Sequence, residues 1–216
     1  MKKTILILIL GLQLFAQENI IKKSRPDVTS PDEEKIVQND DDLLNLTFSI
    51  PYMNQFHTKT DLTYKDQFGF WGLSFGLEYI LTQKNYLSFQ LGKASDLFTP
   101  VPAPFDCVGE QEEFDVIFSN IRINRQVNDW SFGIGICFER LDWRSLNYSI
   151  PQRLINHKPN DGCGLSCMIQ YKLWQKYYIG TIYQPMFYNI TDHIFDYQYF
   201  LSIELGFKRP IIKRKE

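Results

Sequence analysis

Three histidines and one serine–asparagine pair are the residues of this sequence that come nearest to a hydrolytic site. A serine hydroxyl becomes a nucleophile only beside a general base, which is most often an imidazole. His57, His157 and His193 all lie in segments that we expect to be loops, and none is followed by a serine two positions later. The serine of the pair, Ser119, has Ile117 where a histidine would be needed. The sequence therefore predicts no catalytic residue.

Four cysteines are the other candidates for chemistry, as metal ligands or as disulfides. Their spacings match no zinc site and no disulfide scaffold. Cys107 and Cys163 fall in or beside predicted outer loops, so they form either a disulfide or two free thiols. Cys137 and Cys167 are expected on opposite faces of neighbouring strands, where they do not meet. We predict no bound metal and no cofactor.

The elements that would position these residues are strands. Apolar and polar residues alternate with a period of two, which is typical of strands and not of helices. In one segment Trp130, Ile134 and Phe138 share a face, while Gly135 and Glu139 share the other. The eight predicted strands are Leu43–Asn54, Phe68–Leu81, Tyr86–Lys93, Glu113–Arg125, Trp130–Trp143, Cys163–Trp174, Tyr177–Tyr188 and Tyr197–Phe207.

The fourth predicted strand changes phase along its length. Phe114, Val116 and Phe118 alternate in one register, whereas Ile121 and Ile123 follow the other. An extra residue in one strand of a pair produces such a change. We therefore expect a β-bulge near Ser119.

The connections between these strands alternate in length. Three are tight and polar, at 83–85, 127–129 and 175–176, and the others are longer. In outer-membrane barrels the short turns face the periplasm and the long loops face outside. This order predicts both termini in the periplasm. Aromatic residues gather near the short turns, where a membrane interface would lie: Tyr79, Tyr86, Trp130, Trp174 and Tyr177.

The N-terminus has the layout of a secretory signal peptide. Two lysines precede a short apolar run, and Ala16 comes just before a predicted cut at Gln17. The following residues are charged and poor in aromatics, which is typical of a flexible segment. We predict a signal peptide over 1–16, a periplasmic leader over 17–42, the barrel over 43–207 and a basic periplasmic tail over 208–216.

The predicted fold is all-β, an eight-stranded antiparallel up-and-down transmembrane β-barrel. Aromatic residues make up 15% of the chain, and no segment after the signal is long and apolar enough for a helical span. The face opposite the bulky residues is largely Gly and Ser, which suits the crowded interior of a narrow barrel. The alternative is a secreted, lipocalin-like soluble ligand binder, in which the bulky residues would point inward.

An eight-stranded barrel is filled by its own side chains, so charged residues inside it must be paired. Glu78 and Glu204 lie on the second and last strands, which flank the first strand after closure. Two nearby carboxylates repel each other unless cations lie between them. We predict a structural charge cluster near the short turns, made of Glu78, Glu204, Lys172 and Arg122 or Arg125, with Glu139 as a further inward carboxyl group.

With this pattern the chain resembles the small eight-stranded outer-membrane barrels of the OmpA/OmpX type, in the form common in Bacteroidetes. The resemblance covers Leu43–Phe207 and includes the signal ending LFAQ and the apolar last strand. That strand is similar to the C-terminal signal that the barrel-assembly machinery reads, although here residues continue beyond the aromatic Phe207. Lipid A 3-O-deacylases share the architecture, but their His-x-Ser-Asn motif does not occur in this sequence.

The sequence thus predicts a non-enzymatic outer-membrane barrel with a structural or surface-interaction role. Its expected partners are outer-membrane lipid, the assembly machinery during insertion, and an extracellular protein or glycan at the loops Thr99–Glu112 and Asn147–Asp161, because exposed loops on a rigid scaffold usually carry recognition. The net charge of −2 indicates no nucleic-acid partner. The alternatives are a lipid-modifying envelope enzyme and the soluble binder.

Overall fold

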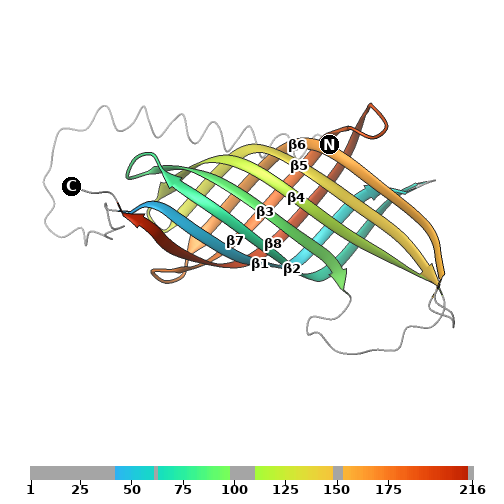
Figure 1. The fold of residues 1–216 in the computed structure, drawn as a ribbon, viewed down its shortest axis with the longest axis horizontal. Helices are drawn as coiled ribbons and strands as arrows, with labels where there is room; N and C mark the ends of the chain where they lie inside the picture. The colour runs from blue at the N-terminus through green and yellow to red at the C-terminus, as the bar shows by residue number, and fades with distance from the viewer. Residues whose placement is uncertain (1–41, 61–62, 98–109, 148–152, 214–216) are drawn as a thin grey trace, which may run out of the picture. The chain divides into compact units, whose positions relative to one another are not determined.

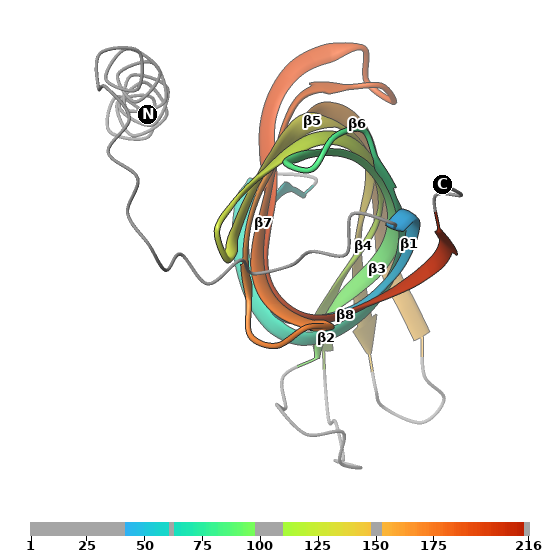
Figure 2. The same ribbon diagram turned by 90° about the vertical axis from the view of Figure 1, so that its left-hand side faces the viewer.

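The chain forms a closed antiparallel barrel in which every strand pairs with its neighbours in sequence and the last pairs with the first. The computed structural model describes residues 42–60, 63–97, 110–147 and 153–213. Figure 1 shows the barrel from the side, and Figure 2 shows it as a ring. The predicted eight-stranded up-and-down fold is confirmed. The strands are β1 (Asp42–Lys59), β2 (Tyr64–Ile80), β3 (Asn85–Leu97), β4 (Glu110–Val127), β5 (Trp130–Asn147), β6 (Arg153–Lys172), β7 (Tyr177–Asn189) and β8 (Ile194–Lys213).

The predicted alternation decides which side chains point outward. Ile134 is 54% exposed and Phe75 is 52% exposed, whereas their inward neighbours are small or buried. Inward glycines make room for larger side chains that project into the lumen from the neighbouring strand. A Cβ atom on Gly206 would lie 2.0 Å from the ring of Tyr178, so this glycine is needed for the packing of that tyrosine.

The predicted bulge in β4 is wrong. Its pairing with β3 and β5 runs without a shift from Asp115 to Arg125. Phe114, Val116 and Phe118 all point into the lumen, where each is at most 1% exposed. The phase change in the sequence reflects a change in what fills the lumen, because the inward residues of β4 change along the strand from Phe114, Val116 and Phe118 to Asn120, Arg122 and Asn124.

A bulge does occur in β2. The register with β3 shifts between Phe70 and Gly72, and Trp71 has a φ of 79°. The side-chain amide of Asn54 donates hydrogen bonds to the carbonyls of Trp71 at 2.9 Å and Ser95 at 3.2 Å. These contacts hold the irregular backbone of β2 against β1 and β3.

The connections after β2, β4 and β6 and both ends of the described chain lie at one end of the barrel, which we call the turn end (left in Figure 1). The predicted alternation of short and long connections is only partly correct, because the connections after β1 (60–63) and β7 (190–193), at the opposite end, are no longer than those after β2 (81–84) and β6 (173–176). Asp42 pairs with Lys213 there. The strand β8 therefore continues through most of the segment predicted as a tail from residue 208, because its backbone stays paired with β1. Of the aromatic residues predicted to surround this end, Tyr86 points inward at 3% exposure, while Trp130 and Tyr177 are exposed.

The strands are longer than predicted at the opposite end, the loop end. The loops predicted at 99–112 and 147–161 extend too far at their C-terminal ends, because β4 begins at Glu110 and β6 begins at Arg153. His57 and His157 likewise lie on β1 and β6 and not in loops, whereas His193 lies in the turn before β8. Polar residues continue the pairing beyond the apolar segments, which a hydrophobicity pattern does not reveal. The predicted signal peptide and residues 17–41 of the predicted leader lie outside the described residues.

Candidate functional site

The lumen holds three layers of side chains along its axis. The layer nearest the turn end is polar and charged, the next is aromatic and apolar, and the third is polar again. The first, which we call the lower polar layer, consists of Glu78, Gln90, Arg122, Gln170, Glu204 and Lys208. Each comes from an inward position of its strand, so the alternation of the sequence places all of them in the barrel.

An ion pair between Glu78 and Lys208 lies on the turn-end side of the lower polar layer. Lys208 Nζ lies 2.7 Å from Glu78 Oε1 and 3.1 Å from the side-chain oxygen of Gln170. The ammonium group also lies 5.1 Å and 5.0 Å from the ring centroids of Tyr86 and Tyr178. Aromatic faces attract a cation that is held over them. This cation is therefore fixed by a carboxylate, an amide and two rings.

Glu204 lies deeper and is fully buried. It accepts hydrogen bonds from Ser49 at 2.6 Å and from the amides of Gln90 and Gln170 at 3.2 Å each. Arg122 donates to the side-chain oxygen of Gln90 at 2.7 Å. The opposite charges of Glu204 and Arg122 are thus joined through one amide, which satisfies the requirement that buried charges be hydrogen-bonded.

The structure brings together only part of the predicted charge cluster. Glu78, Glu204 and Arg122 share the lower polar layer, while Arg125 points outward. Lys172 makes no ion pair within the described part of the chain, although it borders the same cavity as Glu78. Its expected place beside Glu78 is taken by Lys208. The alternation of β8, continued past Phe207, would have identified Lys208 as an inward residue.

Glu139 stands apart from the other lumen charges. It is 4% exposed, and no N–H or O–H group of a described residue donates a hydrogen bond to either carboxyl oxygen. Its pairing partners across the backbone are Phe118 and Gly162, which places it beside the aromatic layer. A buried carboxyl group without a cation is costly to ionise. Glu139 is therefore a polar group inside the apolar part of the lumen and no member of the lower polar layer.

The aromatic layer closes the lumen. Phe200 lies 5.5 Å from both Phe56 and Phe118 between ring centroids, and Phe56 lies 6.5 Å from Phe114. Leu141, Trp143, Met186, Val116 and Ala94 complete a cluster in which every member is at most 5% exposed. This arrangement is a packed core within the barrel. It separates the two polar layers.

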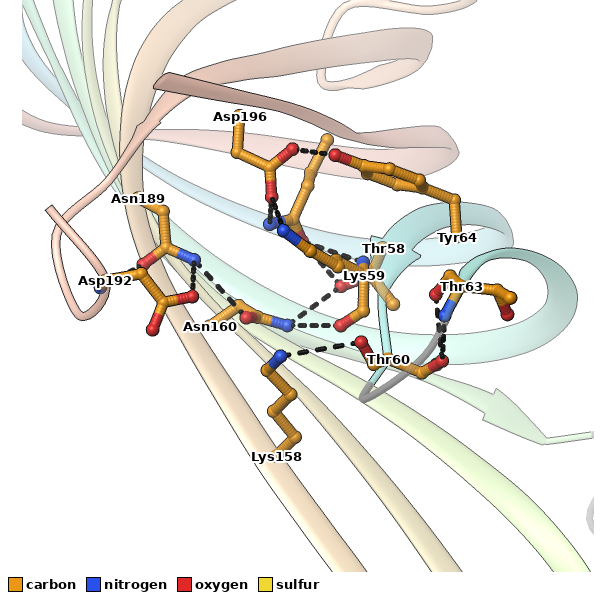
Figure 3. Close-up of polar contacts among 11 residues, drawn as sticks. Thr58, Lys59, Thr60, Thr63, Tyr64, Lys158, Asn160, Asn189, Asp192 and Asp196 are labelled. Carbon is orange, nitrogen blue, oxygen red and sulfur yellow. Dashed lines mark hydrogen bonds and ion pairs between the residues drawn. The ribbon is translucent and has the colours of Figure 1, made fainter. Parts of the chain in front are cut away.

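The upper polar layer ties β1 to β6, β7 and β8 near the loop end (Figure 3). The amide of Asn160 donates to the Lys59 carbonyl at 2.9 Å and to the Thr58 hydroxyl at 3.3 Å. Thr58 in turn donates to Gln198 at 2.6 Å, and the Asn189 amide donates to Asn160 at 3.3 Å. The lumen is therefore bridged again above its apolar core.

A cavity of about 260 Å³ opens at the turn end. Glu78, Lys208, Gln170, Lys172 and Tyr178 are among the residues that line it. Acidic and basic groups are mixed around it, so its lining carries no strong charge of one sign. None of the described residues that line this cavity belongs to the aromatic layer.

The outer wall is apolar on all eight strands. Leu46, Phe75, Phe89, Ile121, Ile136, Ile169, Ile179 and Leu205 are examples, one from each strand, and each is at least 38% exposed. Toward the loop end the outward residues become charged, as in the Arg140–Asp161 and Lys93–Asp115 ion pairs. We call the apolar zone the belt.

The described cysteines and histidines form no nucleophilic pair. Cys137 is buried in the lumen, while Cys163 and Cys167 are partly buried, and all three are free thiols. Cys107, for which we predicted either a disulfide with Cys163 or a free thiol, lies outside the described residues. His57 and His157 contact Asp66 and Asp142 at 2.8 Å and 2.5 Å. Among the described residues, no serine, threonine or cysteine hydrogen-bonds to either imidazole.

Comparison with known proteins finds no match to a protein family or to a curated protein. Solved structures with a similar strand arrangement include Neisserial surface protein A (7% identity, TM-score 0.46, covering 78% of this chain and 97% of that one). Others are Ail of Yersinia pestis (10%, 0.49, 78% and 99%) and OprG of Pseudomonas aeruginosa (9%, 0.38, 81% and 100%). At these identities and superposition scores, none of them assigns a family or a function to the chain. Helices long and apolar enough to cross a membrane do not occur in the described ranges.

Proposed function

We propose that this protein is an integral barrel of a bacterial outer membrane, with its turn end in the periplasm and its loop end outside. The observation that carries the proposal is the belt. Soluble monomers rarely expose a continuous apolar surface of this extent, whereas membrane barrels carry an outward apolar band around an interior filled with polar residues. The predicted signal peptide supports export.

The packed lumen supports a structural or surface-interaction role over transport. An aromatic core and two hydrogen-bonded layers fill the space that a diffusion pore would need. The interior of an eight-stranded barrel is just wide enough for its own side chains. The part of the molecule that can meet external partners is therefore the loop end.

The ends of β4, β5 and β6 support a contact role for the loop end (Figure 1). β4 pairs with β5 from Glu110 onward, but its pairing with β3 ends at Asp115. β6 pairs with β5 from Arg153, but its pairing with β7 begins only at Gly162. Beyond the barrel these strands form a three-stranded ribbon whose two edges have no strand partner among the described residues. Such edges bind extended peptides by strand addition.

The location is tested with epitope tags in the full chain expressed in a Gram-negative host. A tag after Asn156, at the tip of β6, should bind antibody on intact cells, and a tag after Lys84, in a short turn, should bind only after the outer membrane is opened. Heat-dependent migration on gels serves as the control that both variants fold. Recovery of the untagged chain in the soluble fraction, or the reverse labelling pattern, would overturn the proposal.

A further inference from the structure

A cluster of tyrosines surrounds His57 on the outer wall, at the loop-end margin of the belt. The imidazole stacks between the rings of Tyr64 at 5.4 Å and Tyr199 at 5.2 Å, with interplanar angles of 5° and 10°. Tyr197 lies 6.0 Å from Tyr199, and its hydroxyl is 2.5 Å from that of Tyr183. We call these five residues the tyrosine–histidine patch. They come from β1, β2, β7 and β8, which are adjacent in the barrel.

Polar neighbours hold the rings of the patch in place. Asp66 lies 2.8 Å from Nδ1 of His57, and the Gln55 amide donates to the Tyr199 hydroxyl at 3.2 Å. The Tyr64 hydroxyl donates to Asp196 (Figure 3). The second imidazole nitrogen, Nε2, has no hydrogen-bond partner among the described residues. A rigid aromatic group with a free polar edge binds a ligand at low cost in conformational entropy.

The charges around the patch distinguish it from the rest of the loop-end margin. Over β3 to β6 this margin carries ion pairs such as Arg140–Asp161. At the patch, the Lys59 ammonium group lies 5.9 Å from the ring centroid of Tyr64 and 3.8 Å from Asp196, and Asp66 faces His57. The patch therefore presents phenolic and imidazole hydrogen-bonding groups without excess positive charge. This chemistry suits the hydroxyl groups of a sugar better than a phosphate, which Arg and Lys clusters recognise.

The patch continues directly into the belt along β8. Below Tyr199 on β8 follow Leu201 and Ile203, and Met53 lies toward the turn end from His57 on β1. Met53 is 37% exposed and Ile203 is 38% exposed. A ligand that covers both surfaces must be apolar at one end and rich in hydroxyl groups at the other.

We propose that the tyrosine–histidine patch binds the sugar headgroup of a glycolipid whose acyl chains lie along β8 and β1. The site rests on the proposed membrane location, since only in a membrane do acyl chains lie against the belt. It would hold one glycolipid on one side of the barrel, in contrast to an aromatic girdle that contacts the interface all round.

The test uses the purified full chain in nanodiscs that contain either rough lipopolysaccharide, which carries sugars, or phosphatidylglycerol, an anionic lipid without sugar. Native mass spectrometry measures retained lipid. We expect the wild type to retain lipopolysaccharide and not phosphatidylglycerol. The Tyr197→Leu/Tyr199→Leu variant should lose about tenfold in affinity, equivalent to about 1.4 kcal/mol. His57→Phe, which keeps a stacked ring and removes both nitrogens, should also bind more weakly.

The matched control is Tyr79→Leu/Tyr177→Leu, which removes two exposed tyrosines near the turn end and should retain lipopolysaccharide like the wild type. Heat-dependent migration shows that each variant is folded. Equal retention by the patch variant and the control, or equal retention of both lipids by the wild type, would refute the site. Failure of the wild type to enter nanodiscs would instead refute the proposed membrane location, so the two failures are distinguishable.

Discussion

Lys208 and Lys172 differ in what surrounds their ammonium groups, although both are inward residues near the turn end. Lys208 contacts the Glu78 carboxylate at 2.7 Å and lies over two tyrosine rings. Lys172 faces the open cavity and makes no ion pair with the described residues. An ion pair inside a protein matters most when one partner is removed, because the remaining charge is left in an unfavourable environment. The two lysines should therefore respond differently to substitution.

Lys208→Met should destabilise the barrel by roughly 2–4 kcal/mol, because the 6% exposed side chain of Glu78 would remain charged without its partner. Lys172→Met serves as the matched control and should cost well under half of that. Urea unfolding of the refolded barrel in detergent, followed by tryptophan fluorescence, measures both. Adding Glu78→Gln to Lys208→Met should recover part of the loss. Equal effects of the two lysine substitutions would contradict the assignment of Lys208 as the partner.

At the scale of a strand, β5 shows how one element serves three environments. Near the turn end its outward residues are aromatic, at the middle they are isoleucines, and beyond Phe138 they become Arg140, Asp142 and Arg144. The inward face changes from serine and glycine to Leu141 and Trp143 over the same length. The outward face of β5 is thus apolar within the belt, and its inward face is apolar within the aromatic layer. The second zone lies further along the strand, toward the loop end.

Ile134→Arg should strongly impair assembly, because this outward position of β5 lies within the belt and is 54% exposed. An arginine on the lipid face near the bilayer midplane costs roughly 2–4 kcal/mol. Ile134→Leu, which keeps an apolar group there, should assemble normally. The readout is the fraction of outer-membrane protein that shows heat-dependent migration. Normal assembly of Ile134→Arg would show that this face does not meet lipid.

At the scale of the whole molecule, closure decides what the barrel can do. The lumen is blocked by Phe56, Phe118 and Phe200 and bridged by polar side chains on both sides. Interiors packed in this way have few voids larger than a water molecule. Beyond the cavity at its turn end, the barrel is thus a closed scaffold that presents its outer wall and its loop end.

The purified protein in planar lipid bilayers should therefore pass no steady ionic current. Phe200→Ala, which removes a ring that contacts both Phe56 and Phe118, should produce more frequent current events if the aromatic layer is the barrier. Single-channel recording measures this, and protein-free bilayers and Ile134→Leu are the controls. A stable open conductance of the wild-type barrel would contradict the closed lumen.

The sequence by itself determined the strand number, the outward faces of β2, β5 and β8 and the positions of the three turns at the turn end, but not the equally short connections after β1 and β7. These features are local: a period of two along one strand assigns each residue to a face, and polar turn residues end the strand. Extension of β5 and β6 past the belt was missed, because there the apolar residues that reveal alternation give way to charged residues, although the pairing continues.

Contacts across the lumen were decided only by the tertiary structure. Alternation identifies Glu78, Glu204, Arg122 and Lys172 as inward, but the stagger between strands on closure sets the height at which each lies. That stagger brings Lys208 of β8 to Glu78 of β2 and leaves Lys172 without an ion pair among the described residues. In the same way it gathers His57 and its tyrosines from four strands at one place on the wall. The spacing of these residues in the sequence does not predict their contacts, because the contacts depend on how the ring of strands closes.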